Sequence, residues 1–369
     1  MPATTDSPTE IADPINARIL AVSEDQLQGF QADPFADIAR RSGVALDEVH
    51  TRLRAMLEAG TIRRIRQTLL ANKLAEGALV AWKVPEEKLN AAFDWMHAND
   101  PFSGHAVIRS TDAETPGSKY RLWTTLKVPQ GKSIEQHCDI LQRIVGAEAW
   151  KAMPAKKLFA LGVGHIRRRS LEIGAMADEP SQPIDTKVLP IADEHWPILE
   201  ALKRELAIDE IGPDLWAKRA AEAGVSLETF VDVCGQFAER GILGRFSTFL
   251  EHHKRLATGE RVTKFNALYH WRVPVGRELE AGGEVGRFHC MTHGYWREGG
   301  PEFANVNIMG VSHGTEKDRV LAHKAAIDEH LQSCGIGFDY TNVFWGGRSE
   351  IKPSEISPAV HDGWLAQYQ

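Results

Sequence analysis

The pattern of apolar and polar positions along the chain predicts one run of elements twice. In each half, two amphipathic helices are separated by a glycine turn, and a second glycine ends the second helix before a short apolar strand. The helices are expected at 34–43 and 44–60 in the first half, and at 214–224 and 225–241 in the second. Helix, turn, helix and strand in this order are typical of a winged helix-turn-helix.

A second motif follows each of these segments. It begins with an alternating strand that ends in proline, Val80–Pro85 in the first half and Tyr269–Pro274 in the second. The remaining elements are expected as helix 86–99, strands 104–109 and 120–128, helix 133–146 and strand 157–163, and later as helix 275–286, strands 292–297 and 305–313, helix 315–335 and strand 340–344. The order β-α-β-β-α-β predicts an α+β fold with ferredoxin-like sandwiches.

Matching residues recur at a nearly constant offset, which indicates a tandem duplication. The offset is 181 positions from Gly60 to Gly241, 189 from Trp82 to Trp271, and 188 both from His105 to His293 and from Arg109 to Arg297. We therefore expect a disordered tail at 1–14, winged helix 1 at 15–70, ferredoxin-like domain 1 at 71–177, a linker at 178–190, winged helix 2 at 191–250, ferredoxin-like domain 2 at 251–350 and a C-terminal tail at 351–369. The two sandwiches should pack sheet against sheet as an internal pseudo-dimer, with both His/Arg strands near a shared cleft. The sequence leaves open whether two copies of the chain also associate as a homodimer.

Composition narrows the class of protein. A chain of 369 residues with 43% hydrophobic and 25% charged residues suits two or more ordinary globular domains, and it has no apolar run of membrane-spanning length. The polar N-terminus lacks the features of a signal peptide. The four cysteines (Cys138, Cys234, Cys290 and Cys334) form no CxxC pair, which argues against a zinc site or a disulfide framework and favours the reducing cytoplasm.

The helix-turn-helix segments lack the charges that DNA recognition requires. A recognition helix needs Arg, Lys, Asn or Gln for bases and several cations for phosphates. The second candidate, Ser226–Glu239, contains no Lys or Arg, and the first offers only Arg52 and Arg54. With a net charge of −7 as well, we expect these motifs to pack or dimerise rather than bind DNA.

The second half carries a cluster of candidate site residues. His293, Tyr295 and Arg297 alternate, so their side chains should share one face of a strand. Asn305, Asn307 and His313 are expected on or near the strand that follows. Arginine binds carboxylates through paired hydrogen bonds, and histidine or tyrosine can deliver a proton, so the face suits a multiply anionic ligand. The polar outer face of an antiparallel sheet explains the same pattern equally well.

The first half repeats the cluster only in part. His105 and Arg109 match, Val107 stands at the position of Tyr295, and Tyr120 and Trp123 are expected on the next strand. The basic runs Arg63–Arg66 and Arg167–Arg169 could bind carboxylates, but solvated strand ends have the same sequence pattern. A third polar run, His252–Lys254, lies beside the second wing. Two adjacent histidines on a strand face opposite ways and would not chelate one metal together.

These motifs resemble those of the siroheme decarboxylases, an enzymatic branch of the Lrp/AsnC-like superfamily. The resemblance rests on Ile62–Ile65 (IRRI), Ala81–Pro85 (AWKVP), Tyr120–Leu126 (YRLWTTL), Thr292–Arg297 (THGYWR) and Asn305–Gly314 (ending VSHG). It spans roughly residues 25–345 and appears in both halves, as expected of a fused form of two subunits. In this family a tyrosine is usual where Val306 stands and an aromatic residue where Val107 stands.

The resemblance implies a cytoplasmic lyase that removes acetate carboxyl groups from siroheme, giving didecarboxysiroheme in the alternative haem or haem d1 pathway. It implies no cofactor, because the substrate is itself an iron tetrapyrrole. His293 would donate the proton, Tyr295 would support it, and Arg297 would hold a carboxylate, with His105 and Arg109 acting in the first half. Two alternatives stay open: a ligand-sensing transcription regulator of the Lrp/AsnC type, and a non-catalytic tetrapyrrole-binding protein.

Overall fold

The computed structural model describes residues 7–24, 26–161, 171–250 and 264–368, and it divides the chain into two compact units. Unit 1 comprises residues 1–74 and 189–254, and unit 2 comprises 75–188 and 255–369. Each unit therefore takes one segment from each half of the chain. The basic run at 167–169 and His252–Lys254 lie outside the described residues.

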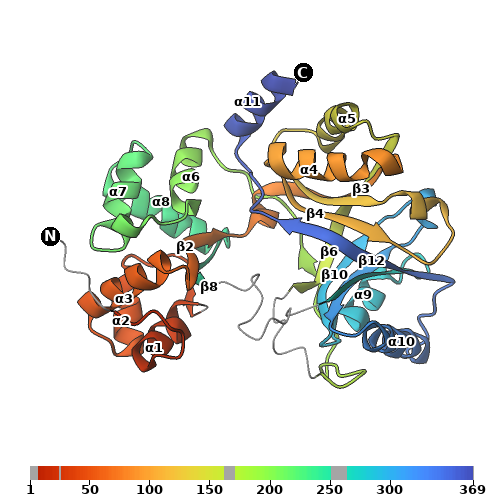
Figure 1. Ribbon diagram of the computed structural model, residues 1–369, viewed down its shortest axis with the longest axis horizontal. Coiled ribbons are helices and arrows are strands. Elements are labelled where there is room, and N and C mark those ends of the chain that lie inside the picture. Colours follow the sequence, from red (N-terminus) through yellow and green to blue (C-terminus); the bar gives the residue numbers. More distant parts are fainter. Residues whose placement is uncertain (1–6, 25, 162–170, 251–263, 369) are drawn as a thin grey trace. The chain divides into compact units, whose positions relative to one another are not determined.

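Unit 1 contains the helix-rich segments of both halves (Figure 1). Its elements are α1 (Pro14–Ser23), β1 (Leu27–Gln28), α2 (Pro34–Ser42), α3 (Leu46–Glu58) and β2 (Ile62–Leu69), followed by α6 (Trp196–Lys203), α7 (Leu215–Glu222), α8 (Leu227–Glu239) and β8 (Leu243–Leu250). The four helices predicted around the glycine turns are confirmed. Local chemistry explains α2: Asp33 caps its first turn by accepting from the Ala36 amide, Pro34 opens it, and Gly43 ends it at φ 66°.

The two helical segments of unit 1 share one core. Strand β8 lies between β1 and β2, so a strand of the second half is paired on both edges by strands of the first. Phe35 from α2 packs edge-on against Phe246 from β8, with ring centroids 5.8 Å apart, and Trp216 stacks on Phe230. These segments consequently bury their apolar faces against each other.

The predicted disordered tail at 1–14 is wrong for its described part. Helix α1 already begins at Pro14, and the Asn16 side chain donates to the carbonyls of Pro8 and Glu10 at 2.8 and 3.0 Å. The Thr61 hydroxyl holds the Thr9 carbonyl. A polar composition suggested fraying, but these backbone carbonyls accept hydrogen bonds from Asn16 and, 52 residues along the chain, from Thr61.

Unit 2 contains the β-α-β-β-α-β order twice. The first copy consists of β3 (Ala75–Lys83), α4 (Leu89–Asn99), β4 (Ser103–Ser110), β5 (Leu122–Pro129), α5 (Ile134–Val145) and β6 (Ala149–Leu161). The second consists of β9 (Phe265–Arg272), α9 (Glu278–Gly286), β10 (Met291–Arg297), β11 (Ile308–Gly314), α10 (Lys317–Ser333) and β12 (Tyr340–Ile351). A short strand, β7 (Ile184–Asp185), adds to β6 from within the predicted linker.

The two sheets of unit 2 join along both edges. Strand β6 pairs with β3 over Ala149–Pro154 and then with β10 over Ala155–Leu161. Strand β12 repeats this arrangement, pairing first with β9 and then with β4. The strand order β10-β11-β9-β12-β4-β5-β3-β6 therefore closes into a ring, because β6 returns to β10. The sheets face each other as expected, but they are also continuous.

This double pairing explains why two predicted strands were too short. The expected strands 157–163 and 340–344 correspond to β6 and β12, which contain 13 and 12 residues. Each strand needs one stretch for its own half and another for the opposite half. The second stretch of β12 is polar and glycine-containing, so its pattern alone did not indicate a strand.

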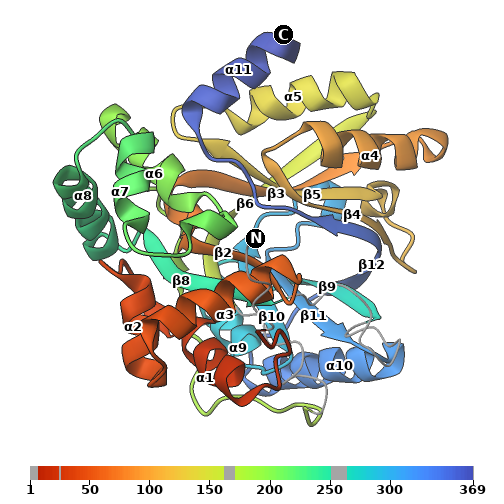
Figure 2. The ribbon, with the colours of Figure 1, turned by 60° about the vertical axis from the view of Figure 1, so that its left-hand side comes forward.

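Helices cover the outside of the ring, and an apolar layer fills its inside. Helices α4 and α5 cover one sheet and α9 and α10 the other (Figures 1 and 2). Facing side chains of both sheets meet in a third cluster that includes Val107, Trp123, Met153, Leu268 and Phe344. The inner face of the ring is thus a single interior shared by the two halves.

The segment predicted as a C-terminal tail, 351–369, also differs from the prediction, because most of it is a packed helix. Residues Pro358–Tyr368 form helix α11, which lies beside α5 in Figure 2. Trp364 belongs to the core under α4 and α5, stacks on His137 with centroids 4.4 Å apart, and donates to the Asn99 carbonyl. Among the described residues, no helix combines the length and apolar character needed to cross a membrane.

Candidate functional site

The two predicted histidines lie on the inner face of the ring and approach each other. The turns that follow β4 and β10 meet at one end of the ring, where Tyr120 packs on Phe303 at 5.3 Å between centroids. The opening residues of β4 and β10, which include His105 and His293, therefore lie toward the other end. Burial, Arg109 and His293 together lower the pKa of His105 to about 4.

The prediction that His293, Tyr295 and Arg297 share a face is confirmed. The rings of His293 and Tyr295 are nearly parallel, at 12°, with centroids 6.1 Å apart, and the Arg297 Cζ lies 4.3 Å from the Tyr295 centroid. The face points inward, because Arg297 is buried and donates to the Met153 carbonyl, whereas Trp296, on the opposite face of β10, packs against the core under α9 and α10. The alternative of a solvated outer face is thereby excluded for β10.

Thr292 fixes the orientation of two imidazoles. Its hydroxyl donates to the Val311 carbonyl at 2.9 Å and contacts Nδ1 of His293 at 3.2 Å and Nδ1 of His313 at 3.3 Å. Since the only hydroxyl hydrogen is used by the carbonyl, both imidazoles must donate from Nδ1. In the neutral form of His293 the lone pair is then on Nε2.

Arg109 reaches across a neighbouring strand. Its Nη1 donates to the Asn266 side chain at 3.2 Å and to the Phe344 carbonyl at 3.3 Å. Gly346 lies opposite both Arg109 and Asn266 in the ladder. A Cβ at Gly346 would meet the Asn266 side chain at 3.1 Å, so the glycine leaves room for this contact.

Three cations in this interior lack a carboxylate partner among the described residues. Arg109 and Arg297 are 4% and 8% exposed, and each keeps a buried Nε without a hydrogen-bond partner in the described part of the chain. Arg297 otherwise donates to the Met153 carbonyl. Burial lowers the pKa of Arg109 to about 10, and burial together with Arg297 lowers the pKa of Lys127 to about 8. Buried unpaired charge is costly, so this arrangement suits an anionic ligand.

Aromatic side chains and one further histidine lie in the same interior. His270 on β9 is fully enclosed and packs between Phe344 (4.9 Å) and Trp123 (6.1 Å). Burial, followed by Arg109, lowers the pKa of His270 to about 3, so this imidazole is neutral at physiological pH. The interior therefore combines aromatic side chains with cationic and neutral hydrogen-bonding groups, a mixture that suits an anionic aromatic ligand.

Several other predicted residues lie elsewhere. Asn307 precedes β11 and is structural: its side chain bonds the Val273 amide and carbonyl and reaches Glu278. Asn305 occupies an exposed turn at φ 55°, so the predicted start of the strand at 305 is wrong, since β11 begins at Ile308. The turn replaced the expected strand start because 3-10 helix Pro301–Phe303 comes directly before it.

Tyr120 also precedes its strand rather than lying on it, because 3-10 helix Pro116–Lys119 ends there. It borders a cavity of about 690 Å³ that is also lined by Lys83, Lys119 and Glu302. Trp123 is on β5 as predicted and donates to the Tyr120 carbonyl. The basic run at 63–66 belongs to unit 1, where Arg64 and Arg66 lie over the ring of Phe249.

Sequence reasoning missed four residues of this interior: Thr292, Lys127, Asn266 and His270. Thr292 was overlooked because neighbours on a strand should face opposite ways, whereas a register shift interrupts β10 between Met291 and His293. Lys127 and His270 lie on inward-facing positions of strands that the alternation did predict, and Asn266 lies on the strand of His270 but before its predicted start at Tyr269. Their polarity within apolar strands was the available signal.

The sequence and fold were compared with known proteins. Residues 74–160 match the family model of the AsnC-like ligand binding domain. The chain is 25% identical over 316 residues to a siroheme decarboxylase from Hydrogenobacter thermophilus, covering 83% of this chain and 86% of that protein. It is 29% identical over 131 residues to the siroheme decarboxylase alpha subunit of Desulfovibrio desulfuricans, covering 35% and 70%.

Solved structures show the same fold. The crystal structure of the siroheme decarboxylase NirDL aligns with a TM-score of 0.68 at 17% identity, covering 96% of this chain and 98% of that one. The structure of NirDL in complex with an iron-uroporphyrin III analogue aligns equally well, at 16% identity. The chain is thus a homologue of the siroheme decarboxylases, with an AsnC-like ligand binding domain in its first half.

Proposed function

We propose that this protein removes carbon dioxide from acetate side chains of siroheme, without oxidation, to give didecarboxysiroheme in the alternative haem or haem d1 pathway. Both sequence relatives carry the name siroheme decarboxylase. The observation that carries the proposal is a set of three cations, the buried Arg109 and Arg297 and the half-buried Lys127, that have no carboxylate partner among the described residues. They share an interior with His105 and His293. Siroheme is a flat macrocycle with several carboxylates, which these groups would bind.

The reaction needs three things from the protein. The carboxylate must be held out of the plane of the macrocycle, the carbon–carbon bond must break with its electron pair left on the methylene carbon, and that carbon must then take a proton. The conjugated macrocycle of the substrate accepts the electron pair, so we propose that no separate cofactor is required. Carbon dioxide leaves, and a methyl group remains.

We assign to His293 the role of donating the proton to the methylene carbon, and to Tyr295 the role of assisting His293. Thr292 accepts a hydrogen bond from Nδ1 of His293, so the proton passed to the substrate would leave from Nε2 of the imidazolium form and return the ring to its neutral state. Burial raises the pKa of Tyr295, which keeps its phenol protonated and able to donate a hydrogen bond. Tyr295 also places its ring beneath Arg297, which would orient a carboxylate.

His105 plays a different part in this proposal. Its lowered pKa, about 4, makes it neutral in the free protein at physiological pH. Carboxylates of a bound substrate would raise that pKa again, because nearby negative charge favours the imidazolium. The first half also has Val107 in place of a tyrosine. We therefore propose that the second-half cluster contributes more to turnover.

We also propose that unit 1 is a duplicated winged helix that supports assembly rather than DNA binding. Helix α8 contains no Lys or Arg, and Leu227 at its start is 47% exposed. The two halves would act as an internal pseudo-dimer, and the scattered cysteines support a cytoplasmic location.

The decisive experiment is anaerobic incubation of the purified protein with siroheme, followed by mass spectrometry of the tetrapyrrole. We expect the mass to fall by two carbon dioxide molecules. A protein that binds siroheme and leaves its mass unchanged would be a carrier and would overturn the enzymatic proposal. A sequence-specific shift of promoter DNA at physiological salt, with no tetrapyrrole binding, would support the regulator instead.

A further inference from the structure

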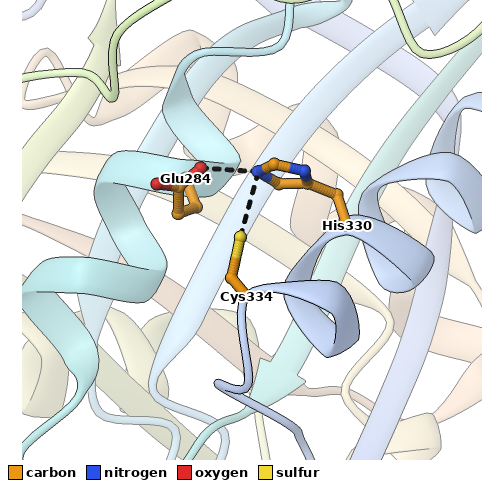
Figure 3. A group of neighbouring side chains, drawn as sticks. All are labelled: Glu284, His330 and Cys334. Carbon is orange, nitrogen blue, oxygen red and sulfur yellow. Dashed lines mark hydrogen bonds and ion pairs between the residues drawn. The ribbon is translucent and has the colours of Figure 1, made fainter.

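A second cluster of chemically active side chains lies outside the ring, between α9 and α10. Glu284 projects from α9, while His330 and Cys334 project from the last turn of α10 and its C-cap (Figure 3). Their ligand atoms all lie within 4.8 Å of one another. His330 and Cys334 are four residues apart, which places both on one face of the helix.

The three donor atoms converge on one point. His330 Nε2 lies 2.5 Å from Glu284 Oε2 and 3.5 Å from Cys334 Sγ. A relay of the Cys-His-Glu type would use different ring nitrogens for the acid and the thiol. Here a single nitrogen serves both, and one N–H cannot satisfy both partners well. Such convergence is the arrangement expected around a cation.

Neighbouring groups hold two of the donors in place. Arg287 donates to Glu284 Oε2 at 3.0 Å and fixes the carboxylate, and the Phe288 ring packs edge-on against His330 with centroids 5.3 Å apart. Support of this kind orients metal ligands in proteins. The side chains of Glu284 and His330 are 12% and 16% exposed, whereas Cys334 is exposed and leaves a path from solvent.

We propose that Glu284, His330 and Cys334 bind a thiophilic divalent cation such as Zn²⁺, with a fourth position open to water. Imidazole, thiolate and carboxylate are the ligands that zinc takes in proteins, usually in a tetrahedral set. The cysteine spacing gave no sign of the site because each of its ligands is a different residue type and they come from two helices. The cation would join α9 to α10 on the outer layer, apart from the interior assigned to the substrate.

The test uses the full chain, reduced and freed of metal, and titrates it with Co²⁺ as a spectroscopic probe and with Zn²⁺ as competitor. We expect one equivalent of Co²⁺ to give a thiolate-to-metal charge-transfer band that Zn²⁺ removes. Cys334→Ser should abolish the band, whereas Cys234→Ser, at a buried cysteine in unit 1, should keep it.

A matched pair of carboxylates tests the helix α9 ligand. Glu280 and Glu284 both lie on α9, and each pairs with an arginine three residues away. Glu284→Gln should weaken Zn²⁺ binding by about 10-fold or more, the scale of a disturbed metal shell. Glu280→Gln should leave it unchanged, and both variants should keep the wild-type circular dichroism spectrum.

Three results would overturn the proposal: no charge-transfer band with the wild-type protein, a band that survives Cys334→Ser, or equal affinities of the two glutamate variants. Zinc bound to the folded state alone should also raise the melting temperature of wild type and not of Cys334→Ser. None of these readouts depends on decarboxylase activity, so failure of one proposal leaves the other standing.

Discussion

The Arg297 guanidinium lies over the Tyr295 ring, with its Cζ 4.3 Å from the ring centroid, deep inside the ring of strands. The pair has no counterpart in the first half, where Val107 takes the place of the tyrosine and Arg109 turns to Asn266 instead. Both arginines are buried without a carboxylate partner in the described part of the chain. A buried arginine of this kind destabilises the free protein but can bind an anionic ligand strongly.

This leads to a prediction for Arg297→Met. Loss of a charged hydrogen bond to substrate should weaken siroheme binding by about 1.5–3 kcal/mol. The melting temperature of the free protein should stay the same or rise, because a buried unpaired charge is replaced by an apolar chain of similar volume. Equilibrium binding and thermal unfolding measure the two effects.

Arg52→Met is the matched control, since Arg52 is equally buried but bonds Asp13 at 3.0 Å and Glu48 at 2.6 Å. This change should lower the melting temperature and leave siroheme affinity unaltered. A fall in stability for both variants, with unchanged affinity for Arg297→Met, would show that Arg297 is structural.

The two histidines should differ in their effect on turnover. His293→Ala should reduce the rate of decarboxylation by roughly 100-fold or more, the scale of a lost general acid, with a smaller effect on binding. His105→Ala should cost less, because that imidazole is neutral in the free protein and has no neighbouring tyrosine. Single-turnover kinetics under anaerobic conditions would measure both. Equal losses would mean that the halves are catalytic equals.

The two helical glycines Gly282 and Gly235 should respond to alanine in opposite directions. A Cβ at Gly282 would collide with the Phe159 ring on β6, so Gly282→Ala should destabilise unit 2 by about 1–3 kcal/mol. Gly235 in α8 has no atom within 4 Å of such a Cβ, and Gly235→Ala should stabilise by about 0.5–1 kcal/mol. Urea unfolding compares them, and a stabilising Gly282→Ala would disprove the close packing of α9 on β6.

Helix α11 should be essential to the core under α4 and α5. Trp364 is 6% exposed, and Trp364→Ala should cost about 3–5 kcal/mol, as for other buried aromatic truncations. Val360 lies on the same helix but is 42% exposed, so Val360→Ala should change stability by less than about 0.5 kcal/mol. Similar small losses from both substitutions, in chemical unfolding, would show that the helix does not dock in solution.

The free energy of unfolding should decrease as the pH falls through the range in which an unperturbed histidine side chain takes up its proton. The folded pKa values of His270 and His361 are lowered to about 3 and about 4, in each case first by burial. The unfolded chain therefore takes up protons below about pH 6.5 while the folded protein does not. Each histidine's contribution is complete above about pH 6.5, and is lost at up to about 1.4 kcal/mol per pH unit as the pH falls toward its folded pKa.

Urea unfolding between about pH 7 and pH 5 measures this slope above the range in which most carboxylates titrate. His270→Gln should make the dependence on pH shallower by one histidine. An unchanged slope would show that His270 is protonated, or solvated, in the folded protein.

Features that depend on short stretches of chain were predictable from the sequence. The capped helix α2 follows from Asp33, Pro34 and Gly43, and the shared face of His293, Tyr295 and Arg297 follows from the two-residue period of a strand. The repeated β-α-β-β-α-β order likewise follows from periodicity and from the offset between matching residues. Each of these depends on backbone geometry that neighbours along the chain determine.

The direction in which that face points, and the residues that it contacts, depend on how the two halves pack. Backbone hydrogen bonds form equally well with any strand edge, so no local pattern could indicate that β6 and β12 each continue onto the opposite half and close the ring. The lowered pKa of His105 results from burial and from Arg109 and His293, the latter 188 positions away. Burial and the local electric field depend on residues that are distant in the sequence and become neighbours only when the chain folds. The same holds for the ligand atoms of Glu284, His330 and Cys334, which come together from two helices.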